Sequence, residues 1–128
     1  MTDQFAATEA SAGPSGPADR SDPAGLWTGI DALWSWLDEN RVHGGQEGLL
    51  LQMLKLSEEV GEVAQAVIGA TGQNPRKGTT HTWEDVESEL CDVVITALVA
   101  LRTLTPDTHE VFTRHLARVK RRSLGGTS

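Results

Sequence analysis

The chain lacks the residues that mark several classes of protein. It has a single cysteine among 128 residues, which excludes an intramolecular disulfide framework and any multi-cysteine zinc site. No apolar run approaches the ~18 residues that a membrane-spanning helix needs. The N-terminus has no basic segment followed by an apolar one, so we expect no secretory signal. These absences predict a soluble protein of a reducing, cytoplasmic compartment with no membrane partner.

Positive charge is also scarce. Eleven Lys and Arg residues stand against 18 Asp and Glu, for a formal net charge of −7. A protein that binds duplex nucleic acid through its phosphates needs a broad basic surface, which this composition does not supply. We therefore expect no nucleic-acid partner. Only the basic segment 114–122 favours a DNA-binding helix-turn-helix, and the overall charge disfavours it.

Large apolar side chains are rare at the start of the chain. Apolar residues make up 38% of the sequence, below the ~45–50% typical of globular proteins, and segment 1–25 consists mostly of Ala, Ser, Gly, Pro and Asp. Such a segment cannot bury enough surface to offset the entropy lost on ordering. The sequence predicts a disordered tail over 1–25 and one helical domain over 26–124.

From Leu26 onward the apolar residues recur at three- and four-residue steps, which is helical spacing, and no alternating strand pattern is found. Glycine pairs, a polar loop over 70–82 and threonine caps divide this region. They predict four helices: one from Leu26 to Gly44-Gly45, one over about 46–69, one from Trp83 to about Leu104 with a Thr82/Asp85 capping box, and one from a Thr105 cap to about Arg122. The predicted fold class is all-α, a domain resembling a four-helix bundle.

The second and third predicted helices share an unusual pattern of charge. Each is apolar on most sides and carries two acids three residues apart, Glu59/Glu62 and Glu89/Asp92. Residues at that spacing lie on one face of a helix. A helix that is apolar nearly all round is buried, either in its own bundle or at a seam between subunits. We therefore expect the four carboxylates to face inward or into a cleft.

Local positive charge does not neutralise these acids. Between Glu58 and Asp92 there are eight acidic residues and two basic ones, Arg76 and Lys77. Burial of a carboxylate without a counter-charge costs several kcal/mol. A single acidic pair is usually a solvated face, but such a face would have Lys or Arg four residues on, and none of the four acids has one. Hard divalent cations would supply the charge, because oxygen ligands suit Mg²⁺, and Mn²⁺ as the alternative.

Two other metals fit the residues less well. Di-iron sites in helical bundles use Glu-x-x-His motifs. The four histidines stand in no such relation to the acids: His43, His81, His109 and His115. Zinc is disfavoured for the same lack of soft ligands, because the single cysteine, Cys91, stands inside the second motif but faces away from its acids.

The segment KLSEEVGEVAQAV, followed by ELCDVV, resembles the MazG-like all-α nucleoside triphosphate pyrophosphohydrolases. The family signature, E-x-x-E on one helix and E-x-x-D on the next, is matched by Glu59 with Glu62 and by Glu89 with Asp92. The resemblance covers about residues 26–122. It implies Mg²⁺-dependent cleavage of the α–β phosphoanhydride of a (d)NTP to (d)NMP and pyrophosphate, by a helical domain that forms a homodimer or homotetramer.

The resemblance also implies roles for single residues. Glu59, Glu62, Glu89 and Asp92 would ligate Mg²⁺, and either Glu59 or Glu62 would act as general base. Lys55 would reach the triphosphate or, alternatively, pair with Glu59.

Further basic residues are candidates for phosphate contacts. Arg76 and Lys77 stand in the loop between the two acidic helices, and Arg118 and Lys120 stand near the end of the last helix, where relatives meet phosphates across the dimer. The alternative to an enzyme is a catalytically weak or inactive helical interaction or regulatory module of the same fold. It is favoured by Thr96, which stands where many relatives carry an aromatic residue.

Overall fold

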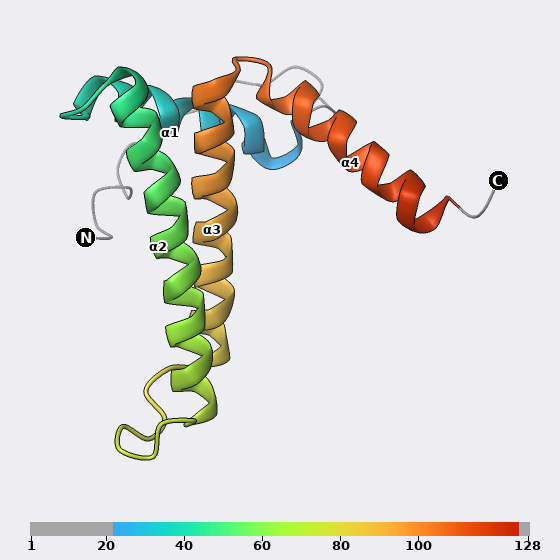
Figure 1. Ribbon diagram of the computed structural model, residues 1–128. Coiled ribbons are helices and arrows are strands. Elements are labelled where there is room, and N and C mark those ends of the chain that lie inside the picture. Colours follow the sequence, from blue (N-terminus) through green and yellow to red (C-terminus); the bar gives the residue numbers. More distant parts are fainter. Residues whose placement is uncertain (1–21, 126–128) are drawn as a thin grey trace, which may run out of the picture.

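The computed structural model describes residues 22–125 and contains four α-helices (Figure 1). The elements are a short 3-10 turn (Pro23–Gly25), α1 (Leu26–Asn40), α2 (Gly45–Thr71), α3 (Trp83–Leu104) and α4 (Thr108–Leu124). No strand occurs within 22–125, so the predicted all-α class and the number of helices are confirmed. None of the described helices combines the length and the apolarity needed to cross a membrane.

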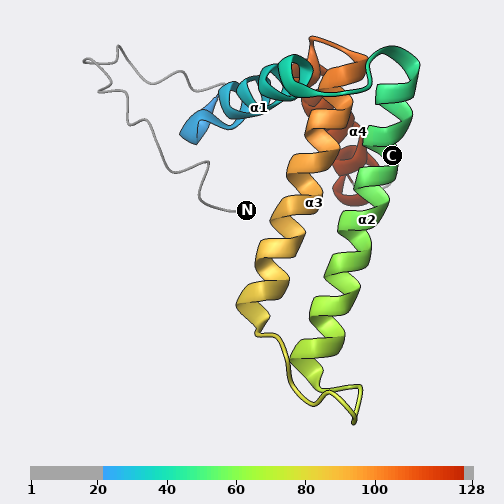
Figure 2. The same ribbon diagram turned by 90° about the vertical axis from the view of Figure 1, so that its left-hand side faces the viewer.

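The α2 and α3 helices form an antiparallel pair, α1 crosses one end of that pair, and α4 leads away from it (Figures 1 and 2). The pairing of α2 with α3 is the most extensive contact between elements of the described chain. Gly72 ends α2 in the left-handed conformation, with φ 65°, which glycine adopts without strain. A short loop then returns the chain to the start of α3.

The predicted capping box begins α3. The Thr82 hydroxyl accepts from the Asp85 N–H at 3.2 Å, and the Asp85 carboxylate accepts from the Thr82 N–H at 2.9 Å. These two bonds satisfy backbone donors that a helix leaves unpaired at its first turn. The sequence therefore placed the start of this helix correctly.

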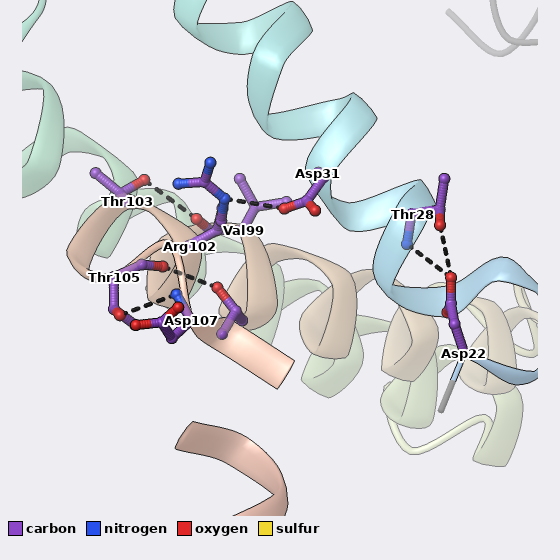
Figure 3. A network of polar contacts seen from close by, with 9 residues as sticks. Asp22, Thr28, Asp31, Val99, Arg102, Thr103, Thr105 and Asp107 are labelled. Carbon is purple, nitrogen blue, oxygen red and sulfur yellow. Dashed lines mark hydrogen bonds and ion pairs between the residues drawn. The ribbon is translucent and has the colours of Figure 1, made fainter. Parts of the chain in front are cut away.

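The predicted start of α4 is wrong. The helix begins at Thr108 rather than after a Thr105 cap, because Thr105 is still extended as the C-cap of α3. Its hydroxyl accepts from the Asp107 N–H at 3.1 Å, and its carbonyl accepts from the Thr108 hydroxyl at 3.0 Å (Figure 3). These bonds hold the chain in a turn between the helices.

The N-terminal boundary also differs from the prediction. Residues 1–21 of the expected tail lie outside the described residues, whereas residues 22–25 are folded. The Asp22 carboxylate accepts from the Trp27 N–H at 2.6 Å. It also accepts from the Thr28 hydroxyl at 2.6 Å (Figure 3). Because it satisfies donors at the first turn of α1, Asp22 belongs to the folded part of the chain.

The core lies where α1 crosses α3. Ile30, Leu98 and Val99 are buried there, and partly buried side chains of α1 surround them: Trp27, Leu33, Trp34 and Leu37. The three- and four-residue steps of α1 thus form one contact face, as the spacing predicted.

Of the two settings expected for α2 and α3, the described chain does not supply burial in its own bundle, and a seam between subunits stays a prediction. Only one face of each helix packs on the other, α1 covers one end, and α4 leads away (Figure 1). Large apolar residues of both helices are therefore exposed: Leu50, Leu54, Val60, Ile68, Leu90 and Val94.

Candidate metal centre

Acidic side chains from α2 and α3 meet along the line of contact between the two helices. Oxygen atoms of Glu59, Glu89 and Asp92 lie within 4.8 Å of one another. Magnesium binds oxygen at ~2.0–2.1 Å, so two ligands on opposite sides of the ion stand about 4.2 Å apart. The three carboxylates are therefore close to the spacing that a shared cation requires.

Burial at this point leaves carboxylate oxygens without partners. Glu59 is 8% exposed, Glu89 is half-buried and Asp92 is exposed. Oε2 of Glu59 and Oε2 of Glu89 are both buried and accept no hydrogen bond from the described part of the chain. An unpaired buried carboxylate oxygen is costly, and such atoms in a folded protein point to an ion or water that completes them. The residues present thus fit a hard cation.

The fourth predicted acid, Glu62, lies beside this group. The negative charge of Glu59 raises the pKa of Glu62 above its ordinary value, with further contributions from burial and from Glu89. A carboxyl pKa moves in this direction when like charges gather without a counter-charge. The structure therefore brings together all four acids of the two motifs, which we call the acid cluster: Glu59, Glu62, Glu89 and Asp92.

Lys55 is the cation nearest to the acid cluster. Its Nζ lies 3.1 Å from Glu59 Oε1 and 3.5 Å from Glu58 Oε1. The hydrogen bond to Glu59 raises the pKa of Lys55, so the lysine stays charged. Of the two roles expected for Lys55, the structure displays the pairing with Glu59. One exposed ammonium leaves most of the negative charge of the cluster uncompensated.

The other predicted basic residues lie away from the acid cluster. Lys77 lines a cavity beside the loop between α2 and α3, whereas its neighbour Arg76 does not, and both residues are exposed. Arg118 and Lys120 are exposed on α4, which leads away from α2 and α3 (Figure 1). A single chain therefore does not bring these two residues to the acids.

One cavity lies on the α1 side of the acid cluster, and we call it the α1 cavity. It has a volume of about 240 Å³, and Trp34, Gln52 and Val99 are among its lining residues. Gln52 precedes Glu59 by seven residues, and Val99 follows Asp92 by seven, so the cavity is about 10 Å along the helices from the acids.

A second cavity lies on the opposite side, and we call it the loop cavity. It has a volume of about 320 Å³ and is lined by residues of α2 and of the loop, among them Gln65, Lys77 and His81. Gln65 follows Glu62 by three residues, about one helical turn. The acid cluster is thus flanked by a cavity on each side along the α2–α3 pair.

Trp34 and His81 belong to no motif in the sequence, yet both line these cavities. The guanidinium of Arg102 lies 4.0 Å from the ring centroid of Trp34, whose indole N–H is buried without a partner among residues 22–125. His81 Nδ1 lies 2.9 Å from the Thr80 hydroxyl. The available signal for His81 is its place directly before the N-cap of α3, which fixes its backbone.

Chemically, the centre offers several carboxylate oxygens to one cation, with room for an organic ligand on either side. Comparisons of the chain with protein-family models, with curated proteins and with solved structures give no match, so its function has to be argued from this site.

Proposed function

We propose that the protein is a Mg²⁺-dependent nucleotide pyrophosphohydrolase that cleaves the α–β phosphoanhydride of (d)NTPs to (d)NMP and pyrophosphate. The observation that carries the proposal is the convergence of Glu59, Glu89 and Asp92, with two buried oxygens that find no partner in the described part of the chain. The resemblance of the two acidic motifs to MazG-like enzymes supports the same activity. A metal site alone would fit many proteins, and the resemblance selects phosphoanhydride chemistry among them.

The reaction needs an attacking water, a proton acceptor and stabilisation of the leaving group. The water oxygen bonds to the α-phosphorus, the bond from that phosphorus to the bridging oxygen breaks, and pyrophosphate leaves with the electron pair. A divalent cation bound by the cluster would neutralise phosphate charge and orient the water.

Glu62 is the best candidate for the proton acceptor. It lies beside Glu59 and Glu89 but is not one of the three acids whose oxygens converge, so it would be left to accept the proton from the attacking water. Glu59 is better suited to ligation, since it is buried and oriented by Lys55.

The α1 cavity suits the nucleobase. An indole ring from Trp34 and an amide from Gln52 offer an apolar surface together with hydrogen-bonding groups. Its distance of about 10 Å along the helices from the acids is comparable to the span from the α-phosphate to the base. These two features support placing the base toward α1.

A homodimer or homotetramer is part of the proposal. Contiguous exposed apolar surface marks an interface in soluble proteins, and the outer faces of α2 and α3 expose Leu54, Val60 and Leu90. A second copy would cover these faces, and its α4 would carry Arg118 and Lys120 toward the phosphates. Sedimentation of the wild type against Leu54→Glu tests this, with a monomeric wild type as the contrary result.

The second candidate is a helical interaction or regulatory module without turnover. It is favoured by α4, which leads away from the other helices and exposes Phe112 and Leu116. This arrangement would suit the capture of a partner helix. The two candidates differ in whether the acid cluster takes part in a reaction.

Pyrophosphate release from a panel of ordinary and modified (d)NTPs, with Mg²⁺ or Mn²⁺, tests the proposal. We expect release with at least one nucleotide, accompanied by an equal amount of monophosphate. Release of orthophosphate instead would show that the protein cleaves a bond other than the α–β phosphoanhydride. The absence of any product at millimolar metal would favour the module.

A further inference from the structure

The loop cavity differs in charge from the rest of this acidic protein. Eight residues line it and none is Asp or Glu, although the chain has 18 acids. The polar groups around it include the Lys77 ammonium, the His81 imidazole, the Thr80 hydroxyl and the amides of Gln65 and Asn74. Such a set donates hydrogen bonds and carries positive charge, so its complement is an anion rich in oxygen.

A close approach between helix and loop shapes this cavity. The Thr80 N–H donates to the Gly69 carbonyl at 3.0 Å, which brings the loop against α2. A Cβ at position 69 would stand 2.0 Å from His81 Nδ1 and 2.5 Å from the Thr80 hydroxyl. Glycine is therefore required for the imidazole to lie where it does.

The contact with Thr80 also decides which histidine nitrogen remains available. Nδ1 lies 2.9 Å from the Thr80 hydroxyl. When that hydroxyl donates to Nδ1, the proton of the neutral ring is on Nε2, which can donate to a ligand. His81 is thus oriented by its neighbours and keeps one donor free.

The cavity is large and close to the acid cluster. Its volume of about 320 Å³ far exceeds the ~30 Å³ share of one water. Gln65, at its near edge, lies one turn from Glu62, and the β- and γ-phosphates extend from the α-phosphate by a similar length. A polyphosphate held at the acids would therefore reach it.

We propose that the loop cavity binds the terminal phosphates of the nucleotide, with Lys77 and His81 as the contacting residues. The substrate then lies along the α2–α3 pair with its phosphate end toward the loop. This inference rests on the proposed hydrolase, and it assigns to the loop a role that the exposed basic end of α4 does not fill within one chain.

Binding of inorganic pyrophosphate to metal-free protein, measured by calorimetry in the presence of EDTA, tests the assignment apart from catalysis. We expect Lys77→Gln and His81→Gln each to weaken binding at least about tenfold, which corresponds to about 1.4 kcal/mol. Arg76→Gln should weaken it less than Lys77→Gln, because Arg76 does not line the cavity. Arg121→Gln, which removes one charge from α4, should leave it unchanged.

The assignment is overturned if wild-type protein fails to bind millimolar pyrophosphate, or if Arg121→Gln weakens binding as much as Lys77→Gln. Gly69→Ala gives an independent check, because it displaces His81 while keeping every charge. It should weaken binding with the helical circular dichroism intact, and unchanged binding would contradict the role of His81.

Turnover separates this inference from the proposed function. With the best nucleotide, Lys77→Gln and His81→Gln should raise KM while the stabilisation by Mg²⁺ stays as in the wild type. An unchanged KM would overturn the inference and leave the hydrolase standing. Pyrophosphate binding with the expected variant pattern but no hydrolysis of any nucleotide would overturn the hydrolase and leave an anion site.

Discussion

Carboxylates have opposite surroundings at the α1–α3 junction and in the acid cluster. Two carboxylates have partners here: Asp22 accepts from the first turn of α1, which leads into the junction, and Asp31 pairs with Arg102 of α3 at 2.9 Å (Figure 3). The hydrogen bond from the Thr28 hydroxyl, aided by the Trp27 N–H, lowers the pKa of Asp22. In the acid cluster, repulsion from Glu59 raises the pKa of Glu62, and two buried oxygens have no partner within residues 22–125.

The carboxylates with partners stabilise the fold, whereas those of the acid cluster lower the stability of the metal-free protein. The carboxylates Asp22 and Asp31 need no further partner, because each is matched within the chain. The acid cluster is incomplete on its own, and departures of this kind are expected at functional sites. Removing a carboxylate should therefore have opposite consequences in the two regions.

The largest effect is expected from neutralising the acid cluster. Glu59→Gln and Asp92→Asn should each reduce turnover at least about 100-fold, because each removes a carboxylate that would hold the cation opposite the phosphates. Neither should lower the Tm of the metal-free protein, since each relieves repulsion. Pyrophosphate release and thermal melting measure the two quantities.

Glu87→Gln is the matched control for these variants. Glu87 is an exposed acid of α3 outside the cluster, so its loss should leave turnover within about twofold. A loss of activity as large as that of Asp92→Asn would show that overall charge, and not the cluster, matters.

Magnesium should stabilise the protein through the cluster alone. A ligand at 100 times its Kd stabilises the folded state by about 2.7 kcal/mol, so Tm should rise with the Mg²⁺ concentration. The rise should vanish in Glu59→Gln and persist in Asp31→Asn, whose side chain lies at the junction. A Tm that does not change at millimolar Mg²⁺ or Mn²⁺ would contradict a metal site in the acid cluster.

Local patterns in the sequence predicted a large part of this arrangement. The E-x-x-E and E-x-x-D spacings place two carboxylates on one face of each helix, and pairing of α2 with α3 then brings the four together. The start of α3 followed from Thr82 and Asp85, whose mutual bonds involve only neighbouring residues. Such features depend on contacts within one or two turns of helix.

Features that depend on distant contacts could not be predicted in this way. The Asp31–Arg102 pair joins residues 71 apart where α1 crosses the end of α3. The direction of α4 follows from a turn in which Thr105 is the C-cap of α3 and not the N-cap of α4. The loop cavity needs Gly69 to meet His81 and Thr80, and no spacing rule links those positions.

A smaller effect is expected at the junction from Arg102→Ala. The change removes the ion pair with Asp31 and the contact with the Trp34 ring, so it should destabilise the fold by about 1–2 kcal/mol. Stabilisation by Mg²⁺ should remain. Arg114→Ala, which breaks an exposed pair with Glu110 at 3.5 Å, should have almost no effect on stability. Equal losses in the two variants would contradict the structural role of Arg102.

The smallest effect, and the most direct test of the comparison, is the response of metal-free stability to acid. The folded pKa of Glu62 is above its ordinary value of 4.5. Between the ordinary and the folded pKa the native state therefore binds more protons than the unfolded state. The stability of the protein should rise as pH falls from neutral toward 4.5. The folded pKa of Asp22 is below its ordinary value of 3.8, so its contribution is present above pH 3.8 and is lost as pH falls through the folded pKa. Glu62→Gln should abolish the first trend and Asp22→Asn the second, and both changes in Tm should be smaller than that of Arg102→Ala. Melting curves from pH 7 to pH 3 distinguish the two, and a trend of the same sign for both residues would mean that the acid cluster is as well satisfied as the junction.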